Sequence, residues 1–157
     1  MRLLLFCALI ALGFVPGSAM AKHNGNVCSA KTGSEAGLVD RSNYGVQNNS
    51  TSQYVTVSCP LNRRNLSGDP EPSGTLKVAV YNRNSGALAC TLYTLSSLTG
   101  QIQFSISGNV TGSPGSGSQI ITFPFIIGGE TNNMLIECDV PPIQSGWLSH
   151  IASIYWG

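Results

Sequence analysis

Residues 53–60 read Gln-Tyr-Val-Thr-Val-Ser-Cys-Pro, and this stretch decides the fold class. Val55, Val57 and Cys59 share one face of an extended chain, and the polar residues between them take the other, because successive side chains of a strand alternate. Pro60 cannot donate a backbone hydrogen bond and is expected to end the strand. The pattern predicts a half-buried β-strand whose cysteine points into a core.

The same alternation recurs along the chain, in segments separated by Gly, Pro, Asn and Ser. The predicted strands cover residues 53–59, 75–81, 88–92, 102–106, 121–125, 134–140 and 148–156, with a short strand near 44–47. Residues 108–118 are expected to form a loop. Pro124 cannot donate to a ladder, which predicts an edge strand or a bulge.

In the predicted strand at 102–106, the residues expected to face inward are Ile102, Phe104 and Ile106. In the last strand they are Leu148, His150, Ala152, Ile154 and Trp156. About eight strands and no convincing helix together predict an all-β fold, a two-layer antiparallel β-sandwich forming a single domain over residues 22–157.

The first 21 residues have the pattern of a secretory signal peptide. Arg2 supplies the positive start, an apolar run follows, and Ala19 and Ala21 are the small residues that precede cleavage. Pro16 interrupts the apolar run, which makes it too short for a membrane-spanning helix. The expected location is therefore secreted or periplasmic, with no transmembrane segment.

Removal of the signal peptide takes away Cys7 and leaves Cys28, Cys59, Cys90 and Cys138. Cysteines of an exported protein are expected to be oxidised, and four of them allow three pairings. No Cys-x-x-Cys pair is present, which argues against zinc. The favoured pairing is Cys28 with Cys59 and Cys90 with Cys138, because the first bridge would tie down an N-terminal segment that has little apolar content.

Charge is scarce: 10% of the residues are charged and the formal net charge is +1, whereas about 25% is usual in soluble domains. The positive residues Arg41, Arg63, Arg64, Lys77 and Arg83 are scattered, which argues against nucleic-acid binding. Ser, Thr, Asn and Gly supply the polarity instead. A nearly neutral, hydroxyl-rich surface favours a neutral partner such as a glycan.

Three stretches, residues 57–63, Cys90-Thr91-Leu92 and 138–141, resemble those of short exported bacterial proteins with a signal peptide, four cysteines and β-rich mature chains. The resemblance extends over nearly all of the mature chain. It implies a secreted sandwich, and it implies no particular activity or functional residue.

Candidate catalytic groups are few. A serine hydrolase would have to use His150, but its neighbour Ser149 points to the opposite face of a strand, and no Gly-x-Ser-x-Gly is present. His23 lies close to the expected mature N-terminus, where a terminal amine and a histidine can hold copper. Glu137 and Asp139 share one strand face, and solvated surface charge is the favoured interpretation of that pair.

Aromatic side chains offer a binding surface. Tyr54 and Tyr81 fall on faces opposite the apolar sets, and Trp147, with Tyr44 and Tyr155, adds further rings. Sugar-binding modules stack pyranose rings on exposed aromatic residues of a sheet, whereas cross-strand packing is the ordinary use of such residues. The predicted ligand-stacking residues are Tyr54, Tyr81 and Trp147.

These observations predict a non-catalytic binding or interaction protein of the cell envelope or extracellular space, with no cofactor and no metal site. Its expected partner is a glycan or another envelope protein. One alternative is a subunit of a surface fibre that accepts a donor strand. The other is a small secreted hydrolase or copper-binding protein that uses His150 or His23.

Overall fold

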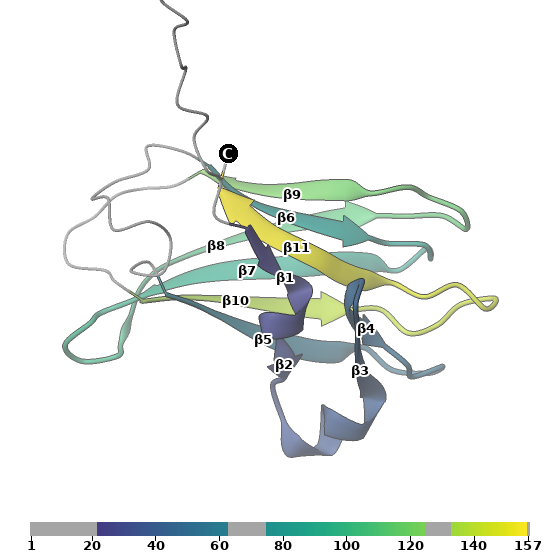
Figure 1. The fold of residues 1–157 in the computed structure, drawn as a ribbon, viewed down its shortest axis with the longest axis horizontal. Helices are drawn as coiled ribbons and strands as arrows, with labels where there is room; N and C mark the ends of the chain where they lie inside the picture. The colour runs from purple at the N-terminus through teal and green to yellow at the C-terminus, as the bar shows by residue number, and fades with distance from the viewer. Residues whose placement is uncertain (1–21, 63–74, 125–132, 157) are drawn as a thin grey trace, which may run out of the picture.

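The computed structural model describes residues 22–62, 75–124 and 133–156 (Figure 1). Its elements are, in chain order, β1 (Lys22–Asn24), η1 (Gly25–Val27), β2 (Ser29–Ala30), η2 (Gly33–Leu38), β3 (Val39–Ser42), β4 (Gly45–Asn48), β5 (Val55–Asn62), β6 (Thr75–Tyr81), β7 (Ala87–Leu95), β8 (Ile102–Thr111), β9 (Gln119–Pro124), β10 (Asn133–Val140) and β11 (His150–Trp156). The predicted signal peptide lies outside the described residues, as do Arg63, Arg64 and Phe125.

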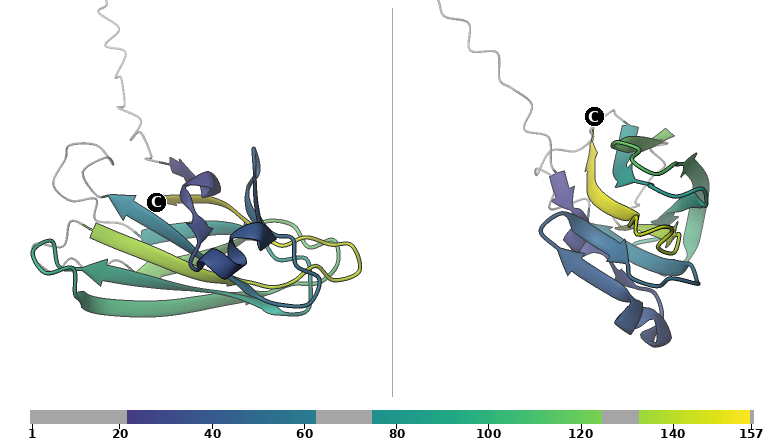
Figure 2. Two further views of the ribbon diagram at one scale, coloured as in Figure 1. Left: turned by 90° about the horizontal axis from the view of Figure 1, so that it is seen from below. Right: turned by 90° about the vertical axis from the view of Figure 1, so that its right-hand side faces the viewer.

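The strands form two antiparallel sheets packed face to face (Figures 1 and 2). The first sheet has the order β3-β4-β11-β6-β9, and β1 also pairs with β11. The second sheet has the order β2-β5-β10-β7-β8. The predicted two-layer antiparallel β-sandwich is therefore confirmed, and the Pro124-containing strand β9 lies at a sheet edge as expected.

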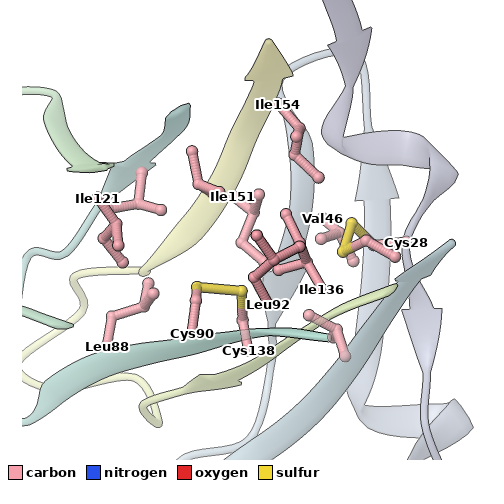
Figure 3. Packing of buried hydrophobic residues seen from close by; sticks show 14 of the residues in the cluster. Cys28, Val46, Leu88, Cys90, Leu92, Ile121, Ile136, Cys138, Ile151 and Ile154 are labelled. Carbon is pink, nitrogen blue, oxygen red and sulfur yellow. A yellow bond between two sulfur atoms is a disulfide. The ribbon is translucent and has the colours of Figure 1, made fainter. Parts of the chain in front are cut away.

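The core lies between the two sheets and is built from the alternating apolar residues. In β6 and β7 every second side chain is buried. Ile151 of the first sheet meets Leu92 and Ile136 of the second in the middle of this core (Figure 3). Apolar burial of this kind is the main stabilising contribution in a small domain, at about 25 cal/mol per Å².

Both favoured disulfides are present, Cys28–Cys59 and Cys90–Cys138. All four cysteines are buried in the core. Cys90 and Cys138 are direct cross-strand partners on β7 and β10, so this bridge lies within one sheet (Figure 3). Both bridges thus strengthen the second sheet, since Cys59 lies on β5 of that sheet and Cys28 precedes β2.

Several strand boundaries were predicted incorrectly. The described ranges hold eleven strands rather than about eight, together with two short 3-10 helices. The strands that the sequence did not reveal are β1, β2 and β3, which have no apolar alternation to announce them. The strand predicted near Tyr44 begins instead at Gly45, and Tyr44 lies in the turn before it.

Two further corrections concern strand ends. Pro60 does not end β5, because β2 pairs with β5 only at Ser58 and Val57, and Pro60 lies beyond that pairing. Strand β8 continues to Thr111, into the segment predicted to be a loop, and pairs with β7 along that extension. Ile102, expected to face inward, is 61% exposed.

The predicted inward face of β11 was wrong in its first half. The register against β6 shifts between Ile151 and Ser153, so that Ala152 is the extra residue of a β-bulge. Ile151 and Ile154 are both buried, although residues three positions apart would lie on opposite faces of a regular strand. His150 therefore faces outward, and a bulge in one strand cannot be read from alternation alone.

The bulge coincides with a change of partner along β11. Before it, His150 and Ile151 pair with β4, and after it Ser153 and Ile154 pair with β1. Two glycines allow the chain to pass close by: a Cβ on either Gly25 or Gly45 would collide with the carbonyl oxygen of Ile151. Gly45 also has φ 125°, which L side chains rarely adopt.

A buried polar network closes one end of the sandwich. Asn84 Nδ2 donates to Pro142 O (2.8 Å) and to Ser149 Oγ (2.9 Å), and Ser149 Oγ donates to Asn82 Oδ1 (3.0 Å). Asn82 Nδ2 donates in turn to Gly86 O (2.7 Å). The network ties the loop after β6 to the loop before β11, and these loops connect the two sheets.

Replacing Gly45 should destabilise the fold through a single added methyl group. Gly45→Ala forces a Cβ against the Ile151 carbonyl in an unfavourable φ region, so we expect a loss of at least about 2 kcal/mol in the free energy of unfolding. Urea denaturation measures it. Gly33→Ala is the matched control, because nothing lies within 4 Å of a Cβ added at Gly33; equal losses for the two variants would contradict the prediction.

Removing the Ser149 hydroxyl should also be costly. Ser149→Ala removes three hydrogen bonds, those with Arg83 N, Asn84 Nδ2 and Asn82 Oδ1, and the loss of hydrogen bonds to buried groups predicts a decrease of about 2 to 3 kcal/mol in the free energy of unfolding. Ser105→Ala, at an exposed position of β8, should change the urea midpoint little. A Ser149 variant as stable as the Ser105 variant would show that the network contributes nothing.

Candidate functional site

Four polar and aromatic side chains form one row across the outer face of the first sheet. In register, Asp40 pairs with Gln47, Gln47 with His150, and His150 with Tyr81. Successive members belong to β3, β4, β11 and β6. Because directly opposed residues of a sheet have neighbouring side chains on the same face, the row places these groups side by side.

His150 and Tyr81 stack on each other, with ring centroids 4.7 Å apart and an interplanar angle of 18°. Tyr81 is therefore the aromatic partner of His150. Burial lowers the pKa of His150 below its ordinary value of 6.5, and the positive charge of Arg83 lowers it further. The imidazole is therefore neutral at pH 7. Tyr81 and His150 together present a pair of stacked rings rather than a single ring.

Arg83 extends the site beyond the end of β6. Its guanidinium carbon lies 5.4 Å from the centroid of the Tyr81 ring and 5.5 Å from that of the Trp147 ring. Both distances are within the range of a cation–π contact. One cation thus connects the aromatic pair on the sheet to an aromatic ring on a loop.

A tight turn presents Trp147. Gln144 and Trp147 exchange backbone hydrogen bonds around Ser145 and Gly146, which have φ of 52° and 79°. Two positive φ values are typical of the type I′ turn of a two-residue hairpin loop. Gln144 Oε1 also accepts hydrogen bonds from Ser85 N (2.9 Å) and Ser85 Oγ (3.0 Å). The loop of Trp147 is therefore fixed to the loop of Arg83.

These residues surround a groove with a volume of about 520 Å³, which is within the range of about 300 to 1,000 Å³ for small-ligand sites. It is lined by Tyr44, Gln47, Tyr81, Arg83, Leu148, His150 and Ala152. We call this the aromatic groove, and Trp147 borders it through its contact with Arg83. Tyr44 is 79% exposed, and Trp147 is 37% exposed. Ala152 is available to the groove because the bulge turns it outward.

The structure brings together two of the three predicted stacking residues. Tyr81 and Trp147 both contact Arg83, whereas Tyr54 packs its hydroxyl against Gly86 and does not line the groove. Sequence reasoning missed Arg83, Gln47 and Leu148. Arg83 follows Tyr81 at a spacing of two, which would have placed them on one side had the strand been extended past residue 81.

The histidines and Ser149 do not form a catalytic arrangement in the described part of the chain. Ser149 is buried in the polar network, on the side opposite His150, as the alternation predicted. The backbone of His23 pairs with Ile154, four residues farther along β11 than His150. Among the described residues, no three His, Cys, Asp or Glu side chains gather closely enough to hold a metal ion.

The carboxylates of the second sheet have local partners. Lys31 Nζ lies 2.8 Å from Glu137 Oε2, and Thr56 Oγ1 donates to Asp139 Oδ1 (2.7 Å). The ion pair is partly exposed, so it contributes little to stability. These contacts favour the predicted role of Glu137 and Asp139 as surface charge. Asp69, Glu71 and Glu130 lie outside the described residues.

No protein-family model and no curated protein matches this sequence. Among solved structures, the chain is similar to carbohydrate-binding module CBM36 in complex with calcium and xylotriose, with a TM-score of 0.50 and 14% identity over 87% of this chain and 99% of that one. It is equally similar to the CBM36-1 domain of a multidomain xylanase from the hindgut metagenome of Trinervitermes trinervoides, with a TM-score of 0.50 and 15% identity over 88% and 96%.

At these identities the similarity shows a common fold. The resemblance to short exported four-cysteine proteins is not tested by it and stays a prediction. Residues 22–62, 75–124 and 133–156 include no helix that is long and apolar enough to cross a membrane.

The buried, neutral state of His150 predicts a pH dependence of stability. Because the folded state lowers the pKa of His150, the unfolded chain takes up the proton first as the pH falls through about 6.5, and the free energy of unfolding decreases. His150→Phe keeps a ring against Tyr81 and removes the titration. Urea denaturation between pH 8 and 5.5 should show a shallower decrease for the variant, and identical slopes would contradict the assignment.

Proposed function

We propose that this protein is a non-catalytic glycan-binding module and that the aromatic groove is its binding site. The observation that supports this most directly is that two aromatic surfaces contact Arg83: the stacked pair of Tyr81 and His150 through the Tyr81 ring, and the ring of Trp147. Aromatic faces bind the apolar faces of sugar rings, and the polar edge of the groove supplies Gln47 for the hydroxyl groups.

The groove is fixed before any ligand arrives. Tyr81 lies on a central strand of the first sheet, and Trp147 is held by a turn that is hydrogen-bonded to the loop of Arg83. A preformed site loses little conformational entropy on binding, which raises affinity for a given set of contacts. The fold similarity to carbohydrate-binding modules is consistent with this role.

The alternatives have weaker support. A fibre subunit would offer its N-terminal segment to a neighbour, but Lys22–Asn24 already pairs with β11 of the same chain. A hydrolase would need an oriented base, and the contact partner of His150 is a tyrosine ring. Two disulfides fit a protein that works in an oxidising compartment, secreted or periplasmic.

A glycan array with the purified mature protein tests the proposal. We expect binding to a restricted set of oligosaccharides, and Trp147→Ala and Tyr81→Ala should each weaken it by about tenfold or more, since a central aromatic contact usually contributes over 1 kcal/mol. Tyr54→Ala is the control, because Tyr54 is an exposed aromatic residue outside the groove. An array without any bound glycan would overturn the proposal, as would equal effects of the three variants.

A further inference from the structure

Arg83 has an unusual electrostatic position for a chain with so little charge. Its guanidinium is held by two aromatic rings and forms no ion pair with any of the described carboxylates, Glu35, Asp40, Glu137 and Asp139. Its Nε atom is buried and has no hydrogen-bond partner. A buried donor without a partner is unfavourable, and more so when the group is charged.

The described carboxylate in the row across the outer face is committed elsewhere. Asp40 Oδ2 accepts a hydrogen bond from Gln47 Nε2 (3.1 Å), and Asp40 lies on β3, three strands away from Tyr81 on β6. Among the described residues that line the groove, Arg83 is a cation and none is a carboxylate, although the chain as a whole is nearly neutral.

Both the side chain and the main chain of Arg83 have contacts here. The guanidinium contacts two rings, and the backbone N–H of Arg83 donates to Ser149 Oγ (3.2 Å), which ties the main chain of this residue to the buried network. A planar guanidinium offers parallel N–H donors that match the two oxygens of a carboxylate. Rings beside it remove water and strengthen such a pair.

We infer that the ligand of the aromatic groove is an acidic glycan, one whose sugar carries a carboxylate that pairs with Arg83, with the ring stacked on Tyr81 or Trp147. This inference rests on the proposed function and specifies its ligand class. It departs from the expectation of a neutral partner, which followed from overall composition. Overall charge governs long-range steering, whereas one unpaired cation inside a groove selects the group that binds there.

The test uses matched pairs of probes that differ only in charge. Trisaccharides of galacturonate, glucuronate and mannuronate are each compared with the counterpart in which the carboxylate has been reduced to a primary alcohol. Isothermal titration calorimetry with the mature protein measures affinity for both members of each pair. We expect at least one acidic probe to bind about tenfold or more tightly than its reduced counterpart, and added salt to narrow that difference.

Substitutions then assign the selectivity to Arg83. Arg83→Met keeps an apolar stem against the rings and removes the guanidinium, so it should abolish the preference for the acidic member of each pair. Arg83→Lys should retain only part of the preference. Lys77→Met is the matched control, because it also removes one positive charge. Lys77 lies on the same outward face of β6 as Tyr81 but does not line the groove.

The outcomes separate the two claims. Equal binding of acidic and reduced probes, with loss on Trp147→Ala, would overturn the acidic ligand and leave the glycan-binding function intact. Binding of sulfated sugars in place of all carboxylated ones would also contradict the inference. Absence of binding to every sugar on the array would overturn both claims. A preference lost equally in Arg83→Met and Lys77→Met would assign it to general charge rather than to Arg83.

Discussion

The hydroxyl of Ser149 is the contact on which the rest of the structure depends. It donates to Asn82 and accepts hydrogen bonds from the Asn84 amide and the Arg83 backbone, all within a region from which water is excluded. Buried polar groups favour arrangements in which their hydrogen bonds are made. Hydrogen bonds are directional, whereas apolar packing is not, so the network fixes the position of the loop after β6 relative to the loop before β11. It thereby fixes the position of Arg83 relative to Trp147.

A second constraint lies along β11, which carries the groove on its outer side and the core on its inner side. The bulge at Ala152 lets one strand pair first with β4 and then with β1. It also exchanges the two faces, so that His150 lies outward while Ile154 still lies inward. A regular strand with the same sequence would bury the imidazole and expose Ile151. The site therefore exists because the strand is irregular, and Gly25 and Gly45 make room for the irregularity.

The sequence predicts those features of the fold and the groove that depend on residues close together in the chain, and it misses those that depend on distant partners. Alternation between Leu76 and Val80 is local, and the strand boundaries of β6 were predicted correctly. The cysteine pairing was also predicted correctly, from the need to tie down an N-terminal segment with little apolar content. The bulge was missed because one inserted residue leaves no mark in composition, and β1 to β3 were missed because short strands depend on their partners rather than on their own residues. Tyr81 and Trp147 were predicted individually. Their common contact with Arg83 depends on two loops that are joined by the buried polar network and by Ser85 and Gln144.

The low charge content of the chain has a specific consequence for the aromatic groove. In a chain rich in charge, an arginine beside two rings would have carboxylates to pair with, and its contribution to binding would be offset by that internal pair. Here the described carboxylates are four, and each has a contact of its own: Glu35 with Thr32, Asp40 with Gln47, Glu137 with Lys31 and Asp139 with Thr56. None of these four forms an ion pair with Arg83, so its charge is available to a ligand. On a surface made mainly of hydroxyls and amides, the single guanidinium of Arg83 can therefore determine which ligand binds.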